Sequence, residues 1–346
     1  MIYLHVPFCE TKCPYCAFNS FTAPLVEAQS YVSAVLRQLE NDIGLYNFRH
    51  ADSLYIGGGT PSMLAAKLYK PFFEALKGVL TGEAEITVEA NPASLVKEWA
   101  EGMAELGANR ISIGVQSFDD RKLKRLGRTH TAQEAIEAIG IAKSAGFEEI
   151  SVDFIYAVKG DTLNLLLNDL RIAAELGVTH ISAYQLTVEN NRALQKIDRN
   201  LEKRFSLAID VAGYPRYEVS NYGKKPSRHN AGYWNGLEYL GLGAGATGTA
   251  RADDGWIRYE PLKSIGAYIA DPRAKTIEKI SQIIYNSERL MLGLRCNEGF
   301  ERSRLTVEQL KRAKFLLAGG KLMARGDRLY NTDLWIGDEI WLYLNQ

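Results

Sequence analysis

The feature that most constrains the fold is a repeated alternation of short apolar runs with amphipathic stretches of helical period. The runs expected to form strands are Ile2–His5, Ser53–Ile56, Glu85–Glu89, Arg110–Gly114, Glu149–Phe154 and His180–Gln185. The helices expected between them are Ser30–Tyr46, Met63–Val79, Leu95–Leu106, Thr131–Ala145 and Leu163–Leu176. Gly107, Gly146 and Gly177 stand where three of these helices should end. Repeated strand–helix units predict an α/β protein with a parallel sheet, and the pattern alone fits an open doubly wound sheet as well as a partial barrel.

The pattern changes after about residue 195. Asn191–Ala212 is expected to form one more helix, whereas Gly213–Gly248 is rich in glycine and aromatic residues and has little periodicity. Long irregular segments inside compact domains usually serve a function. We expect a barrel domain at residues 1–250, a connecting segment at 251–276 and a small α+β domain at 277–346. The elements expected in this last domain, which resembles a winged-helix module, are helices Ser281–Gly293 and Thr306–Ala318 and a hairpin at Gly326.

Charge and hydropathy exclude several classes of protein. The 346 residues include 41 Lys plus Arg and 41 Asp plus Glu, so the chain has no net charge at pH 7. A protein that grips nucleic acid through its phosphates should carry a basic excess. No apolar run is long enough to span a membrane, and the first residues lack the basic and apolar regions of a secretory signal. We therefore expect a cytoplasmic protein that does not bind nucleic acid.

Three of the four cysteines stand in one short window directly after the first predicted strand. Cys9, Cys13 and Cys16 have the spacing CxxxCxxC, and Cys296 is far away, where we expect a buried, inert thiol. Clustered cysteines do not suit a disulfide framework. Three thiolates on one loop can hold a cubane iron–sulfur cluster and leave one iron open for a chelating small molecule. A zinc site would need a fourth ligand, and a thioredoxin-like Cys13–Cys16 pair would share its loop with Cys9.

The residues around the cysteines resemble the cluster loop of radical S-adenosylmethionine (SAM) enzymes. Further blocks stand in the order of that family and cover most of residues 1–250. The matching blocks are HVPFCETKCPYCAF (5–18), YIGGGTPS (55–62), VEANP (88–92), ISIGVQSF (111–118), LGRTH (126–130), VDFIY (152–156), YEVSNY (217–222), RHNAGYW (228–234) and YLGLGAGA (239–246). The resemblance implies a partial (β/α)6 TIM-like barrel, a [4Fe-4S] cluster on the three cysteines and SAM bound at the open iron.

The residues that this resemblance assigns to SAM follow the predicted strands. Gly58, Gly59 and Thr60 come after the second strand, where bare glycines let the backbone approach a ligand, although a strand-to-helix turn also uses glycine. Carboxylates suit ribose hydroxyls and an ammonium group, and arginine suits a carboxylate through paired N–H donors. The other contacts that the resemblance implies are Tyr3, Tyr15, Glu89, Gln116, Arg128 and Asp153. Each alone could be a structural polar residue, whereas together they predict one binding face at the strand ends.

Two departures select a branch of the family. The coproporphyrinogen dehydrogenase pattern has a further cysteine where this chain has Phe18, and a long extension where this chain has eight residues before Cys9. Heme chaperones of the HemW branch resemble the chain at both points. Their heme-binding motif HNxxYW matches residues 229–234, so the resemblance implies a heme contact through His229. A histidine in an aromatic loop is otherwise most often a packed core residue.

The resemblance therefore implies a heme chaperone that binds a [4Fe-4S] cluster, SAM and heme. Such a protein would hand heme to a membrane-bound hemoprotein, for example a respiratory-chain enzyme, and the cluster would serve dimerisation or transfer. An oxygen-independent coproporphyrinogen III dehydrogenase is the alternative. A winged-helix regulator is a third interpretation, with Lys311, Arg312 and Lys314 as a small basic face. Ala17, residues 157–161 and residues 188–192 depart from the family pattern, which weakens the inference about the substrate.

Overall fold

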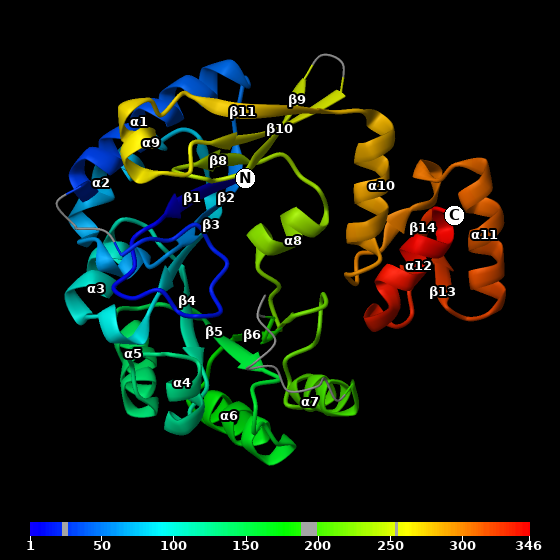
Figure 1. Cartoon of the computed structure of the whole chain (residues 1–346), viewed down its shortest axis with the longest axis horizontal. Coiled ribbons are helices and arrows are strands. Elements are labelled where there is room, and N and C mark those ends of the chain that lie inside the picture. The colour runs from blue at the N-terminus through cyan, green and yellow to red at the C-terminus, as the bar shows by residue number, and fades with distance from the viewer. Residues whose placement is uncertain (23–26, 188–198, 253–254) are drawn as a thin grey trace.

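The computed structural model describes residues 1–22, 27–187, 199–252 and 255–346. Its centre is an eight-stranded sheet in the order β7-β6-β5-β4-β3-β2-β1-β8 (Figure 1). The strands are β1 (Ile2–Val6), β2 (Ala51–Gly58), β3 (Leu80–Ala90), β4 (Arg110–Gln116), β5 (Glu149–Tyr156), β6 (His180–Gln185), β7 (Asn221–Gly223) and β8 (Leu240–Leu242). Neighbours from β1 to β6 pair in parallel, whereas β7 runs antiparallel to β6. The six predicted strands are confirmed, in an α/β sheet of the partial-barrel type.

Helices cover the outer face of this sheet (Figure 1). They are α1 (Ala28–Leu45), α2 (Lys70–Ala75), α3 (Lys97–Glu105), α4 (Asp120–Arg125), α5 (Ala132–Ser144), α6 (Leu163–Glu175) and α7 (Arg199–Val211). Gly107, Gly146 and Gly177 have positive φ angles just after α3, α5 and α6, as expected for C-terminal caps. Of the helix predicted over Asn191–Ala212, residues 191–198 lie outside the described residues, and the rest corresponds to α7.

The helix predicted over Met63–Val79 is wrong in its extent. This segment forms the short 3-10 turns Pro61–Met63 and Ala66–Leu68, followed by α2. Pro71 stands in the first turn of α2. There its missing N–H costs no helical hydrogen bond, whereas in the middle of one long helix its ring would clash with the preceding turn. The proline therefore fixes where this helix begins.

Side chains alternate between the two faces of the sheet. Those of Ile56, Val88, Ile111 and Val152 point outward and belong to the main hydrophobic core. The inward side chains are largely polar and stand in two rows across the strands. One row is Tyr3, Tyr55, Thr87 and Arg110, and the next is Glu89, Ser112, Ser151 and His180. The inside of the partial barrel is thus a polar cavity rather than a packed core.

The segment expected to be irregular contains a short helix, α8 (Arg228–Trp234), which packs on the inner side of β2. Ser227 caps it by accepting a hydrogen bond from the N–H of Asn230. The segment predicted as a connection, 251–276, takes part in an antiparallel sheet and in a helix that packs on the main core. These elements are β9 (Gly248–Ala252), β10 (Gly255–Pro261), α9 (Ile265–Ala270) and β11 (Lys275–Ile280).

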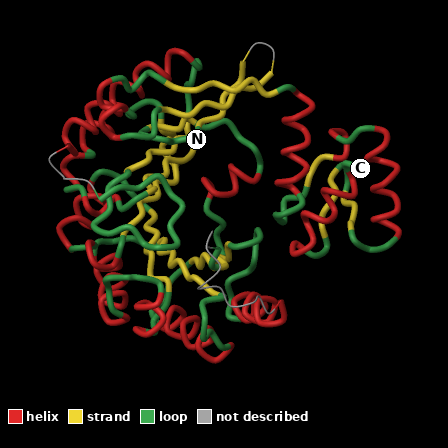
Figure 2. The backbone as a smooth tube through the Cα atoms, viewed as in Figure 1, coloured by secondary structure: helices red, strands yellow, loops and turns green. Residues whose placement is uncertain are grey.

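The last part of the chain is an α+β unit (Figure 2). It has its own cluster of buried apolar side chains, including Leu294, Leu329 and Leu344. Its elements are α10 (Gln282–Gly293), β12 (Phe300–Glu301), α11 (Val307–Ala318), β13 (Leu322–Arg325), β14 (Arg328–Asn331) and α12 (Gly337–Leu344). Both predicted helices and the hairpin at Gly326 are present. α12 was not predicted. The division of the chain at residue 277 stays a prediction.

Candidate cluster and ligand site

The loop that carries the three cysteines lies at the carboxyl end of β1. Its ends are held together because the N–H of Cys9 donates to the carbonyl of Phe21 at 3.0 Å. The N–H of Cys16 donates to the carbonyl of Cys13 at 3.0 Å, which turns the loop tightly. All three thiols are free and half-buried, whereas Cys296 is buried far along the chain. The loop therefore offers three separate sulfur ligands to one face of the site.

Polar groups from other segments of the chain approach two of these sulfurs. The hydroxyl of Thr60 lies 3.5 Å from Cys9 Sγ, and Arg128 Nη1 donates to Cys13 Sγ at 3.5 Å. Among the described residues, no three or more His, Cys, Asp or Glu side chains are gathered around one point that could hold a single metal ion. A cubane cluster instead takes each thiolate on a different iron. Three soft ligands with hydroxyl and guanidinium donors around them therefore fit an iron–sulfur cluster.

The glycines at the carboxyl end of β2 are required by close packing. Gly58 has φ +111°, and a Cβ there would lie 2.3 Å from the ring of His5. A Cβ on Gly59 would lie 2.8 Å from the carbonyl oxygens of Val6 and Phe8. Bare backbone at these positions lets the end of β2 lie directly against the cluster loop. The N–H of Gly58 then points at Glu89, whose Oε2 accepts it at 3.0 Å.

Two half-buried residues with carboxylate side chains, Glu89 and Asp153, face the same space. Burial, together with the nearby charge of Asp153, raises the pKa of Glu89 to about 7, although Tyr55 donates to its Oε1 at 2.6 Å. Burial likewise raises the pKa of Asp153 to about 6 against hydrogen bonds from Ser182 and Ser112. Carboxylates whose charge is this poorly compensated favour a cationic or hydrogen-bond-donating ligand. Tyr55 had no role in the sequence prediction, although it stands at the inward parity of β2.

Gln116 and Arg128 complete the rim of this space. Gln116 ends β4 with φ 65°, a left-handed conformation that is uncommon for a side chain other than glycine and that recurs at ligand sites. Arg128 Nη2 donates to the carbonyl of Gly114 at 3.0 Å, and its Nε is buried without a hydrogen-bond partner in the described structure. The guanidinium is therefore fixed beside the cysteine loop, and its Nε–H group remains available to a ligand.

Two adjoining cavities join these groups. The smaller, about 150 Å³, is lined by all three cysteines, Gly58, Thr60 and Arg128. The larger, about 450 Å³, extends into the barrel and is lined by Tyr3, Tyr55 and Tyr233. Both are lined by Tyr15, Cys16, Glu89, Gln116 and Asp153. The structure thus places every residue that the sequence assigned to SAM in the lining of one or both of these adjoining cavities.

His229, on α8, lines the deep part of the larger cavity. The side chain is only 1% exposed, and both ring nitrogens have partners. Nδ1 lies 2.9 Å from the hydroxyl of Ser53, and Nε2 lies 3.0 Å from the hydroxyl of Tyr233. Burial, together with the positive chain terminus, lowers the pKa of His229 to about 3. The imidazole is therefore neutral, as an iron ligand must be, but it would have to exchange one of these partners for iron.

Comparison with known proteins defines the class that this fold and site represent. The sequence pattern of the Radical SAM superfamily matches residues 3–173. Coproporphyrinogen III oxidase (HemN) from Escherichia coli, a radical SAM enzyme, superposes with a TM-score of 0.83 at 18% identity, over 100% of this chain and 89% of that one. At this identity the likeness shows the fold alone. The chain is thus an α/β protein of the radical SAM class.

The curated relatives narrow this class to one family. Heme chaperone HemW of Escherichia coli (strain K12) is 38% identical over 270 residues, which cover 74% of this chain and 71% of that protein. Heme chaperone HemW of Mycobacterium tuberculosis (strain H37Rv) is 33% identical over 356 aligned positions, 96% of this chain and 90% of that protein. The chain belongs to the HemW family of heme chaperones.

Proposed function

We propose that the protein is a heme chaperone that carries a [4Fe-4S] cluster on Cys9, Cys13 and Cys16, and binds SAM and heme. One observation carries this proposal: a single cavity is lined by Cys16 of the cluster loop and by His229 of the heme motif. Groups that would hold SAM therefore adjoin the group that would hold heme.

The proposed SAM site uses the rim of the smaller cavity. Gly58, Gly59 and Thr60 would face the methionine part through the backbone, and Arg128 would bind its carboxylate. Glu89 and Asp153 would accept from the ammonium group and the ribose hydroxyls, which return negative charge to both carboxylates. Tyr3, Tyr15 and Gln116 would pack against the adenosine part. The cluster, when bound, supplies a low-potential electron and an open iron for chelation.

The proposed heme site is the deep part of the larger cavity. His229 would bind the iron, and this requires that Tyr233 or Ser53 gives up its hydrogen bond to the ring. Burial keeps the imidazole neutral over the whole physiological range of pH. Tyr55 and Tyr233 present aromatic faces and edges on which a flat macrocycle can pack.

We further propose that the loaded protein passes heme to a membrane-bound hemoprotein, such as a respiratory-chain enzyme, from the cytoplasm. No helix in the described part of the chain is long and apolar enough to cross a membrane. Contact with a membrane would then be transient and made through the acceptor. We also propose that residues 277–346 form a separate winged-helix-like domain. The protein would form a homodimer in the presence of the cluster.

Anaerobic cluster reconstitution followed by heme titration tests the heme ligand. His229→Ala should weaken heme binding by about tenfold or more and change the Soret band, because an axial ligand is lost. Tyr233→Phe should leave affinity equal or higher, because it frees Nε2 without removing the ring. His50→Ala, an exposed histidine, is the control. Unchanged heme affinity in His229→Ala would overturn the ligand assignment.

A second assay tests the alternative function. Under reductant, SAM and coproporphyrinogen III, a chaperone should release no 5′-deoxyadenosine that depends on the porphyrinogen. Substrate-dependent 5′-deoxyadenosine together with protoporphyrinogen would instead identify an oxygen-independent coproporphyrinogen III dehydrogenase.

A further inference from the structure

A buried arginine at the floor of the larger cavity has no function in the site described so far. Arg110 is the first residue of β4, is 3% exposed and lines this cavity. It is the one Lys or Arg among the residues that line the cavity in the described structure. A buried guanidinium is costly unless its charge is compensated and its five N–H groups have acceptors. The partners of Arg110 therefore decide whether it is structural.

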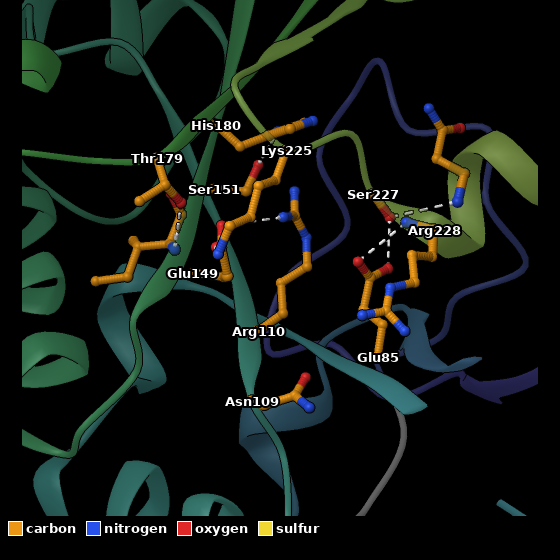
Figure 3. A network of polar contacts seen from close by, with 12 residues as sticks. Glu85, Asn109, Arg110, Glu149, Ser151, Thr179, His180, Lys225, Ser227 and Arg228 are labelled. Atoms are coloured by element: carbon orange, nitrogen blue, oxygen red, sulfur yellow. Dashed lines mark hydrogen bonds and ion pairs between the residues drawn. The ribbon is translucent and has the colours of Figure 1, made fainter. Parts of the chain in front are cut away.

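The protein partners of Arg110 leave it largely uncompensated. Its one ion pair among the described residues joins Nη1 to Glu149 Oε2 at 3.9 Å, too long for a hydrogen bond (Figure 3). Glu149 is already engaged, because Lys225 Nζ lies 2.7 Å from its other oxygen. Oε2 itself is buried with no hydrogen-bond partner in the described structure. The guanidinium therefore lacks a hydrogen-bonded anion.

The other acids near the cavity floor are occupied as well. Glu85 accepts from Ser227 Oγ at 2.9 Å and from the N–H groups of Arg228 and His229 at 3.0 and 3.1 Å, which ties it to the start of α8 (Figure 3). Asp153 also lines the smaller cavity with the cysteines, and its Oδ1 accepts a hydrogen bond from the hydroxyl of Ser112. No acid in the described part of the chain thus accepts a hydrogen bond from Arg110.

A second group beside Arg110 also lacks a partner. Thr87 is paired with Arg110 in the register of β3 and β4, and its side chain lines the same cavity. Its hydroxyl is fully buried and makes no hydrogen bond within the described residues. His180, which lines the same cavity, is hydrogen-bonded at both ring nitrogens. Nδ1 lies 2.8 Å from the hydroxyl of Ser151, and Nε2 lies 2.9 Å from the hydroxyl of Tyr217. Burial and then the charge of Arg110 depress the pKa of His180, so this neighbour is neutral.

We propose that Arg110 and Thr87 form a binding subsite for a carboxylate of the cavity's ligand. One cation and one hydroxyl donor suit a singly charged, planar group, to which a guanidinium can donate two parallel hydrogen bonds. A phosphate dianion would need further cations that the lining lacks. The inference rests on the proposed function only for the identity of the ligand. If the ligand is heme, the carboxylate is that of a propionate side chain. Its binding to Arg110 and Thr87 would orient the macrocycle with this propionate toward the floor of the cavity.

Heme and heme dimethyl ester, in which both propionates are esterified, give a direct test. The cluster-loaded wild-type protein should bind heme about tenfold or more tightly than the ester, as expected for hydrogen bonds to a charged group. Arg110→Gln should lose this preference by weakening heme and leaving the ester unchanged. Thr87→Val should reduce the preference by a smaller factor, and Arg110→Lys should keep part of it. Arg171→Gln, which changes an exposed arginine on α6, is the matched control.

Two outcomes would overturn the inference: an intact preference in Arg110→Gln, or an equal loss of affinity for both ligands. Thr87→Val distinguishes loss of the subsite from a folding defect of Arg110→Gln. The hydroxyl that this variant removes makes no hydrogen bond within the described residues, so the variant should fold normally. Heme binding that is absent from the wild type would instead refute the proposed function. The subsite is then judged with succinate, which should raise the melting temperature of the wild type and not that of Arg110→Gln. An equal shift in both proteins, or none, would refute the subsite.

Discussion

Replacing His229 by glutamine should make the stability of the protein less sensitive to acid. The imidazole is held in the barrel between Ser53 and Tyr233, and its pKa in the folded state is about 3. In the unfolded chain the pKa returns to about 6.5. Above this value both states carry a neutral ring, so the histidine adds no dependence on pH. As the pH falls below it, only the unfolded state takes up the proton, and unfolding becomes easier.

The size of this effect follows from the two pKa values. Between pH 8 and pH 5 the linkage lowers the free energy of unfolding by about 2 kcal/mol. This figure depends mainly on the unfolded state, because the folded ring is still neutral at pH 5. A glutamine at position 229 retains polar atoms for Ser53 and Tyr233 but has no proton to bind. The wild type should therefore lose about 2 kcal/mol more than His229→Gln over this range.

Urea unfolding of the metal-free, reduced protein at pH 8 and pH 5, followed by tryptophan fluorescence, measures this difference. Other buried histidines, such as His180 and His130, titrate equally in both proteins and cancel in the comparison. His50→Gln changes an exposed histidine and should behave as the wild type does. An equal loss of free energy in the wild type and in His229→Gln would refute the argument that burial keeps this ring neutral.

Three further outcomes follow from the contacts. Gly58→Ala should destabilise the fold by about 1–3 kcal/mol and weaken SAM binding, because its Cβ would meet His5. Gly78→Ala, at a positive φ with open space around it, should show only the strain. Lys122→Met should cost about 3–5 kcal/mol in urea unfolding, because it strands two buried carboxylates near Nζ. SAM binding near pH 6.5 should release protons, since a cationic ligand lowers the raised pKa of Glu89, and calorimetry in buffers of different ionisation enthalpy detects this.

Much of the fold was predictable because its signals are local. Strand periodicity and the cap glycines located β1 to β6 and the ends of three helices. The helix predicted over 63–79 failed because apolar spacing outweighed Pro71 in the prediction, whereas in the structure the proline sets the start of α2. The short elements α8 and β8 escaped prediction because seven and three residues are too few to show a period.

The site divides in the same way. Glu89, Gln116 and Asp153 were predicted to converge because parallel strands end at one edge of the sheet, and they line one space. The partner of His229 could not be predicted, because Ser53 lies 176 residues away and meets it through the packing of α8 on β2. The inward position of Arg110 could have been predicted from the sequence. Arg110 shares the inward parity of Ser112, whereas Ile111, Ile113 and Val115 at the other parity are apolar, and a charge at the inward parity points into the barrel.

The distribution of charge along the cavity gives these residues a common meaning. Near the cysteines stand the carboxyls of Glu89 and Asp153, whose pKa values burial raises, and the guanidinium of Arg128. At the floor the free group is the cation of Arg110. A ligand-free protein bears both costs, because burial separates each charge from water and from a close partner. The free-energy cost of each buried charge falls when a ligand of opposite charge binds. Beside the cluster loop a cationic group would compensate the acids, and at the floor an anionic group would compensate Arg110. The lining therefore favours a ligand with ammonium and carboxylate groups beside the cluster loop, and a carboxylate at the floor.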